Sequence, residues 1–257
     1  MSGITSEKVD LHVDGSAMPA FTYTPEGRPE GNGPWPAVIV IQEIFGVNDE
    51  IKGFAARVAE AGYFAVAPDL YHRAGYNVVV AYGPDRDRAR ALRAQASADG
   101  IVADVRATVE HLAGDPHVDA GRIGIVGFCF GGMVSYLAAA RVSGIKAAAV
   151  YYGGEIVPRP DAPPGTPSLL DETAADVQCP IIGFWGDHDH LIPVESVHKI
   201  EAALKAAGKS IENHIYEGAG HGFVWEDRPG HHAAGTKDAW SRTLGFFATH
   251  LAQPARV

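Results

Sequence analysis

Residues 122–132 read RIGIVGFCFGG and join an apolar run to a run of small residues. The first five residues have the apolar, β-branched composition of a strand buried on both faces, and residues 130–141 predict a helix directly after it. Between the two, Gly127 and Gly131 frame Cys129 in the pattern Gly-x-nucleophile-x-Gly. A nucleophile on such a tight turn has strained backbone angles, and side chains at the glycine positions would collide with neighbouring backbone. The stretch therefore predicts a sharp elbow with Cys129 at its tip.

The same alternation of buried strands and helices runs along the rest of the chain. Apolar runs predict strands at residues 37–41, 63–67, 122–126, 146–152, 180–185 and 211–216. Helical spacing predicts a helix after Asn48 or Asp49 and further helices at residues 85–98, 101–112, 130–141, 195–207 and 233–251. Residues 9–13 and 17–23 predict the two arms of an antiparallel hairpin. This order predicts an α/β fold with a mostly parallel central sheet, helices on both faces and an N-terminal antiparallel hairpin.

Residues 153–179 interrupt this alternation with several prolines and acidic residues. Strands and helices resume afterwards in the same style, so the segment is interpreted as an excursion rather than a linker between domains. We therefore expect residues 1–257 to form one α/β domain, for which the chain is long enough.

Composition limits the kind of partner. A formal net charge of -10 disfavours nucleic acid and anionic membranes, because binding phosphates needs clustered Lys and Arg. No apolar run approaches the ~20 residues of a membrane span, and the start MSGITSEKVD lacks a signal-like apolar region. Two cysteines cannot build a disulfide framework. We expect a cytoplasmic protein, monomeric or weakly homo-oligomeric, that acts on a small molecule.

Candidate catalytic side chains follow three other predicted strands. In an open α/β sheet the loops at the carboxyl ends of parallel strands form the site. Glu43 follows the strand at 37–41, and His221, in GAGHGF, follows the last strand. The turn GDHDHLIP offers Asp187 and Asp189, of which the spacing favours Asp189 and leaves Asp187 as a turn-capping residue. Cysteine, acid and histidine thus occur in an order that suits a catalytic triad, with His221 as general base.

Each of these residues has an alternative interpretation. Cys129 at a helix N-terminus favours the thiolate, and the amide of Phe130 would point toward a developing oxyanion, but a free cysteine is often an inert core thiol. Glu43 could be a solvated loop carboxylate. His188, Asp189 and His190 could be imagined as metal ligands, but adjacent residues diverge and no distant cluster completes a shell, so we expect no metal.

Six motifs together resemble the dienelactone hydrolase family of the α/β-hydrolase fold. They are QEIFGVN at 42–48, PDLY at 68–71, GFCFGG at 127–132, YYG at 151–153, GDHDHLIP at 186–193 and GHGF at 220–223. The resemblance spans nearly the whole chain, and the combination of QEIFGVN with a cysteine elbow is highly specific.

This resemblance implies a triad of Cys129, His221 and Asp189 that opens an ester or lactone through a thiol-ester acyl-enzyme, with no cofactor. The backbone amides of Ile44 and Phe130 would form the oxyanion hole. The glutamate that matches Glu43 contacts the thiol in the resting state in this family and helps to control its ionisation.

The resemblance also implies arginines that bind a substrate carboxylate, and here the sequence departs from the pattern. Trp225 stands where one arginine is expected, and Arg228 follows slightly later. Arg86, Arg88 and Arg90 compete for the other position, and Arg88 has the best spacing, although a solvated helix face is the plainer interpretation of this run.

Aromatic side chains are further candidates for substrate binding. Phe45, Tyr152 and Trp225 would line a more apolar pocket, with core packing as the alternative for each. The functional prediction is a hydrolase of the dienelactone hydrolase (carboxymethylenebutenolidase) type. The alternatives are a general carboxylesterase or thioesterase and a non-catalytic protein whose Cys129 is oxidised reversibly.

Overall fold

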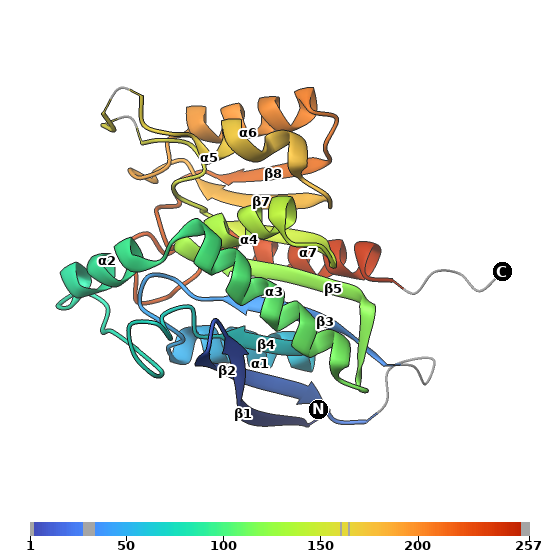
Figure 1. The fold of residues 1–257 in the computed structure, drawn as a ribbon. Coiled ribbons are helices and arrows are strands. Elements are labelled where there is room, and N and C mark those ends of the chain that lie inside the picture. Colours follow the sequence, from blue (N-terminus) through green and yellow to red (C-terminus); the bar gives the residue numbers. More distant parts are fainter. Residues whose placement is uncertain (1–2, 28–33, 160, 164, 253–257) are drawn as a thin grey trace.

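The computed structural model describes residues 3–27, 34–159, 161–163 and 165–252, with an eight-stranded sheet at its centre (Figure 1). The strands are β1 (Ile4–Val13), β2 (Ser16–Pro25), β3 (Trp35–Ile41), β4 (Phe64–Pro68), β5 (Val118–Phe128), β6 (Ile145–Tyr151), β7 (Ile181–Gly186) and β8 (Ile211–Tyr216). The helices are α1 (Asp49–Glu60), α2 (Arg86–Gln95), α3 (Ala98–Gly114), α4 (Phe130–Arg141), α5 (Leu169–Thr173), the short 3₁₀ helix η1 (Ala174–Asp176), α6 (Val194–Ala206) and α7 (Ala233–His250).

The sheet has the order β1-β2-β4-β3-β5-β6-β7-β8. β1 and β2 form the antiparallel hairpin, and β2 pairs antiparallel with β4. All neighbours from β4 to β8 are parallel. Asp14 and Gly15 connect the hairpin with φ of 50° and 79°, the left-handed pair that a two-residue turn needs. The predicted α/β-hydrolase class, with its parallel sheet and N-terminal hairpin, is confirmed.

Helices cover both faces of the sheet (Figure 1). On one face α1 packs against β3 and β4 while α7 packs against β6 and β7, and the two helices meet where Phe54 contacts Trp240 at 5.1 Å between ring centroids. On the other face α3 and α4 cover β5 and β6, and α6 covers β7 and β8. The central strands are buried on both faces, which explains their continuous apolar runs.

The strand order reverses at β3, and this reversal positions the site. After β3 the chain crosses through α1 to β4 on one side, and it returns later to β5 on the other side of β3. The loops that follow β3 and β5 therefore leave in opposite directions and open a crevice at the carboxyl end of the sheet. Glu43 and Cys129 stand on these two loops.

Several element boundaries differ from the sequence prediction, and two of these differences have a clear cause. β5 begins at Val118 instead of residue 122, because Val118 pairs with Trp35 before a register shift. The helix predicted at 85–98 ends at Gln95, since Ser97 caps α3 by accepting the amide of Gly100. The excursion at 153–179 contains α5 and η1. Within the described ranges, none of the helices is long and apolar enough to cross a membrane.

Candidate active site

Cys129 stands at the tip of a strained elbow between β5 and α4. Its backbone has φ of 54° and ψ of -111°, a conformation that side-chain-bearing residues rarely adopt. Its amide donates to the carbonyl of Tyr151 at 3.0 Å. A Cβ on Gly131 would lie 2.6 Å from the carbonyl oxygens of Ile41 and Gln42, and a Cβ on Gly127 would overlap the backbone of Gly131. The two glycines let helix and strands approach closely enough to form the turn.

His221 and Asp189 form a hydrogen-bonded pair in the loops after β8 and β7. Asp189 Oδ2 lies 2.7 Å from His221 Nδ1. The other carboxylate oxygen of Asp189 accepts the amides of Leu191 at 2.8 Å and Ile192 at 3.2 Å, so the buried side chain cannot rotate freely. The exposed Asp187 instead accepts the amide of Gly218 at 2.7 Å and braces the turn. The structure therefore brings Asp189, and not Asp187, to the imidazole.

The electrostatics of His221 favour its protonated form. Burial alone would lower the pKa of this imidazole, but the neighbouring Cys129 and the hydrogen bond to Asp189 raise it well above 6.5. His221 Nε2 is close to the Cys129 thiol, and no atom of the described ranges completes a hydrogen bond with it. An imidazolium beside a sulfur is the arrangement that stabilises a thiolate.

Glu43 is a buried carboxylate on the loop after β3. Burial raises its pKa above 4.5, against the opposing effect of the positive charges of His221 and Arg228. Arg228 Nη2 lies 3.6 Å from Glu43 Oε2, and the indole of Trp225 is beside the same carboxylate. Within the described ranges Glu43 Oε2 has no hydrogen-bond partner. The side chain is therefore poised to accept or hold a proton close to the imidazole.

Ile44 and Phe130 supply backbone amides on the two sides of the elbow. Ile44 lies on the loop that leaves β3, and Phe130 is the first residue of α4, whose amide a helix leaves without an internal partner. Neither amide donates to a backbone carbonyl of the described ranges. Both are available to a ligand oxygen.

A cavity of about 540 Å³ is lined by four of these residues, Glu43, Ile44, Cys129 and His221. Loops from the carboxyl ends of β3, β4, β5, β7 and β8, together with α2, supply its wall. The lining residues are Glu43, Ile44, Phe45, Tyr82, Arg86, Arg90, Cys129, His188, His190, Leu191, Gly218, Gly220, His221, Gly222, Arg228, Pro229 and Gly230. Its volume is within the range of small-molecule sites, roughly 300–1,000 Å³.

The four expected substrate-binding residues occupy different places. Phe45 lines the cavity, whereas Arg88 does not. Tyr152 is fully buried and packs edge-on against the His221 ring at 5.1 Å between centroids. Trp225 packs against Phe128 at 5.0 Å and lies outside the cavity wall.

Arg86 and Arg90 line the cavity in place of Arg88. Residues four apart share a face of a helix and a residue two away points elsewhere, so the rotation of α2 decides between them. Two of the three candidates on this helix thus reach the site.

Arg228 is a charged cavity residue to which the sequence analysis assigned no role. Its side chain is buried and pairs with Glu50 at 2.5 Å and Asp227 at 2.7 Å. Its guanidinium lies 3.6 Å from the centre of the Tyr82 ring. Its position shortly after the GHGF motif is the only feature of the sequence that points to a place for Arg228 in the site. Tyr82 and Leu191 carried no signal beyond their nearness to predicted strand or helix ends, and His188 and His190 were considered only as metal ligands.

The described ranges contain no group of three or more His, Cys, Asp or Glu side chains arranged to hold a metal ion. His188 and His190 flank Asp189 on the cavity wall, while Asp189 is directed to His221.

Comparison with known proteins identifies relatives over nearly the whole chain. The dienelactone hydrolase family model matches residues 18–251, a range that includes Glu43, Cys129, Asp189 and His221. A "Putative carboxymethylenebutenolidase" of Escherichia coli is 37% identical over 250 residues, which cover 96% of this chain and 86% of that protein. The "Carboxymethylenebutenolidase" of Rhodococcus opacus is 30% identical over 247 residues, covering 91% of this chain and 93% of that protein.

A solved structure agrees with this sequence relationship. The crystal structure of a "Putative Dienelactone Hydrolase" from Klebsiella pneumoniae superposes with a TM-score of 0.84 at 32% sequence identity. The superposition covers 96% of this chain and 99% of that chain. Sequence and fold thus point to the same group of proteins.

Proposed function

This chain belongs to the dienelactone hydrolase family, and we propose that it hydrolyses a small ester or lactone with Cys129 as the covalent nucleophile. One observation carries the proposal: the strained elbow presents Cys129 in the same cavity as His221, which is hydrogen-bonded to Asp189. Nucleophile, base and orienting acid are the three parts that acyl transfer needs.

In the first step the Cys129 thiolate attacks the carbonyl carbon of the substrate. A C–S bond forms and the carbonyl π electrons move to the oxygen, which accepts hydrogen bonds from the amides of Ile44 and Phe130. Collapse of this intermediate breaks the C–O bond, and the leaving oxygen takes the proton from Nε2 of His221. An ester releases its alcohol, whereas a lactone keeps the new hydroxyl attached to the acyl group.

In the second step water hydrolyses the thioester. Neutral His221 takes a proton from the water through Nε2, and the hydroxide attacks the acyl carbon. The C–S bond breaks, the acid product leaves, and thiolate and imidazolium are restored. Asp189 accepts the hydrogen bond from the Nδ1–H of His221 throughout and keeps Nε2 directed at the reacting atoms.

Glu43 controls the charge of the resting site in this proposal. Its raised pKa and its free Oε2 make it a proton acceptor for the thiol before substrate arrives. The positive charges of His221 and Arg228 favour its ionised form, and burial favours its neutral form. The balance between these two effects sets the charge of Glu43 beside His221.

Arg86 and Arg90 support a substrate with a carboxylate. Both line the cavity from α2. Arg228 is already compensated by Glu43, Glu50 and Asp227, so it is less available to a ligand. A small lactone or ester that carries a carboxylate on its acyl part fits these charges.

A neutral ester is the second candidate, because the cavity also has apolar wall. Leu191 is 46% exposed and lines the cavity, as does Phe45. Rates with paired esters that differ only by a carboxylate distinguish the two substrates. A preference of kcat/KM for the neutral member would favour the second.

The nucleophile is tested by trapping the acyl-enzyme. With excess p-nitrophenyl acetate, pre-steady-state absorbance should show a burst of p-nitrophenol, and intact-mass measurement of the quenched enzyme should find an acetyl adduct. Cys129→Ala should lose both, while Cys179→Ala, which removes the other, buried cysteine, should keep both. Hydrolysis by Cys129→Ala at the wild-type rate would refute the covalent mechanism.

A further inference from the structure

Tyr71 contacts both loops that carry the proposed oxyanion-hole amides. The residue follows β4, and its side chain is buried. Its hydroxyl donates to the carbonyl of Ile44 at 3.1 Å. Its ring stacks on the Phe130 ring with 6.2 Å between centroids and 11° between planes. The Tyr71 side chain thus contacts both the loop after β3 and the first residue of α4, which follows Cys129 directly.

These contacts act on the orientation of the amides. The carbonyl and the amide of Ile44 belong to adjacent peptide planes, so a hydrogen bond that holds the carbonyl restricts the rotation that directs the amide. The stacked ring restricts Phe130 in the same way from the other side. Burial raises the pKa of Tyr71 above 10, so the hydroxyl keeps its proton and remains a donor.

Tyr71 is itself held in place from its backbone. Its amide donates to Asp69 Oδ1 at 2.9 Å, and the other oxygen of Asp69 accepts the amide of Val78 at 3.3 Å. The same loop presses on the loop after β3: the amide of Val80 donates to the carbonyl of Phe45 at 3.0 Å. Segments 69–80 and 44–46 are therefore joined at several points.

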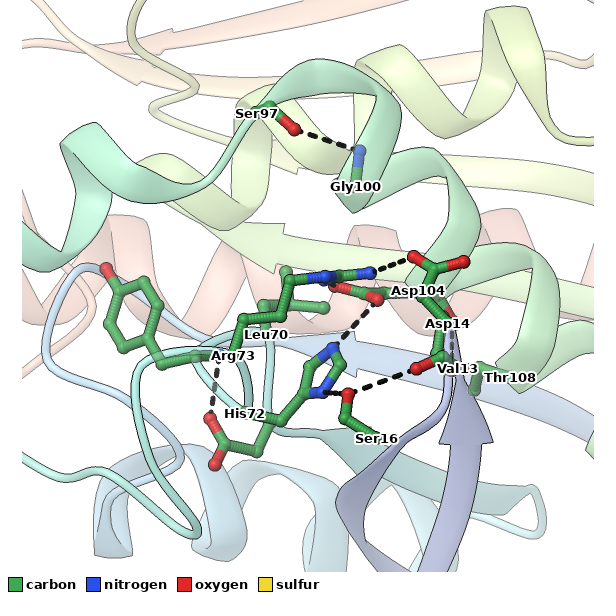
Figure 2. A network of polar contacts seen from close by, with 12 residues as sticks. Val13, Asp14, Ser16, Leu70, His72, Arg73, Ser97, Gly100, Asp104 and Thr108 are labelled. Carbon is green, nitrogen blue, oxygen red and sulfur yellow. Dashed lines mark hydrogen bonds and ion pairs between the residues drawn. The ribbon is translucent and has the colours of Figure 1, made fainter.

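The two residues after Tyr71 anchor the loop on the opposite side (Figure 2). His72 Nε2 lies 3.0 Å from Asp104 Oδ1, and His72 Nδ1 lies 2.9 Å from Ser16 Oγ. Arg73 donates to Asp104 Oδ2 at 2.8 Å and to Asp14 at 2.8 Å. Figure 2 shows His72 between Ser16 and Asp104, so that the hairpin and α3 clamp the loop. This network holds the backbone from which Tyr71 extends.

We propose that Tyr71 is a positioning residue for the oxyanion hole: its hydroxyl orients the amide of Ile44 and its ring orients that of Phe130. The inference rests on the proposed function, because the two amides matter only if an oxyanion develops beside Cys129. Tyr71 touches no reacting atom, and its effect is exerted through the two loops.

Tyr71→Phe tests the hydroxyl while the stacking ring stays. Loss of a direct oxyanion donor costs about 100- to 1,000-fold in kcat, so loss of a group that only orients the donor should cost about tenfold, with KM little changed. Tyr71→Leu also removes the stacking and should cost more than Tyr71→Phe. Tyr136→Phe is the matched control, since Tyr136 is a buried tyrosine whose hydroxyl contacts Thr173, outside the cavity wall.

Two probes of Cys129 separate orientation of the amides from general damage. An aryl trifluoromethyl ketone forms a C–S bond with the thiolate and places a negative charge on oxygen, so its affinity for Tyr71→Phe should fall about as much as kcat/KM. Iodoacetamide alkylates the same sulfur by displacing iodide and develops no oxyanion, so its rate should be unchanged.

The kinetics of Tyr71→Phe and its reactions with the two probes test the inference together. Loss of ketone affinity with unchanged alkylation supports the inference. Equal losses in ketone affinity and in alkylation rate would show that Tyr71 acts on the thiol or on the fold. A wild-type kcat in Tyr71→Phe would show that the hydroxyl does not orient the amide of Ile44. Either result would overturn the inference. Undiminished hydrolysis by Cys129→Ala would instead refute the proposed function itself, and that result is read independently of Tyr71.

Discussion

Arg228 Nη2 lies 3.6 Å from Glu43 Oε2, and both side chains are buried. The same guanidinium pairs with Glu50 at 2.5 Å. One buried cation thus compensates two carboxylates, of which Glu43 lines the same cavity as the candidate nucleophile. The charge of Glu43 depends on this pair, because burial raises the pKa of Glu43 and Arg228 opposes the rise.

Arg228→Gln is expected to destabilise the protein in a pH-dependent way. Removing one partner of a buried pair costs about 3 kcal/mol. Without Arg228 the pKa of Glu43 rises further, so the folded state binds the proton more tightly than the unfolded state. Stability then falls as pH rises through that pKa, and urea unfolding should show a larger loss at pH 8 than at pH 5.

The control for this variant is Arg242→Gln, which removes an exposed pair with Asp238 and should change stability by less than about 1 kcal/mol. A loss in Arg228→Gln that is equal at both pH values would contradict a role for Arg228 in setting the charge of Glu43.

Asp189→Asn is expected to lower kcat by roughly 1,000-fold, because the amide no longer holds the His221 tautomer that directs Nε2 at the reacting atoms. Asp187→Asn changes the neighbouring carboxylate, which only braces the turn, and should keep kcat within a few fold. Steady-state kinetics of the two variants with one activated ester make the comparison. Equal losses would mean that the turn, rather than the contact with His221, limits activity.

Arg86→Gln and Arg90→Gln are expected to raise KM for a carboxylate-bearing ester by about tenfold, the effect of losing one favourable contact of about 1.4 kcal/mol. Both residues line the cavity, whereas Arg88 does not. The first control is Arg88→Gln with the carboxylate-bearing ester. The second is Arg86→Gln or Arg90→Gln with a neutral ester of the same size. KM should be unchanged in both controls. An equal rise in KM for the neutral ester would exclude recognition of a carboxylate by these arginines.

Asp69 is expected to make stability depend on pH near neutrality. Burial raises its pKa from 3.8 to about 6, although its carboxylate accepts the amides of Tyr71 and Val78. The folded state therefore binds this proton more tightly, and the contribution of Asp69 to stability falls as pH rises from about 4 to 6.

Asp69→Asn removes this titration. We compare the free energy of unfolding of the variant with that of the wild type. The difference, variant minus wild type, should grow by up to roughly 3 kcal/mol between pH 4 and pH 7, because each unit of pKa shift corresponds to about 1.4 kcal/mol. Denaturant titrations at several pH values measure the difference. A difference that stays constant across this range would show that Asp69 does not titrate there.

Much of the fold follows from local sequence. The parallel strands are continuous apolar runs because the sheet is buried on both faces, and the helix after Cys129 begins and ends as predicted, at Phe130 and Arg141. Ends of elements were harder to predict, as at Val118, because pairing with Trp35 across a register shift is a long-range contact.

The sequence by itself indicated the family and the residues of the chemistry that we propose. Glycines around Cys129 and a histidine after the last strand are local patterns, and the parallel sheet brings their loops to one edge. It also supplied the three arginines of α2 as candidates.

Only the tertiary structure decided how these groups meet. The rotation of α2 against the sheet turns Arg86 and Arg90 to the cavity and leaves Arg88 outside. The approach of the loop after β4 brings the Tyr71 hydroxyl to Ile44, and burial of Arg228 beside Glu43 joins residues far apart in the chain. Such contacts depend on how whole elements pack, and no periodicity or spacing within a single segment encodes them.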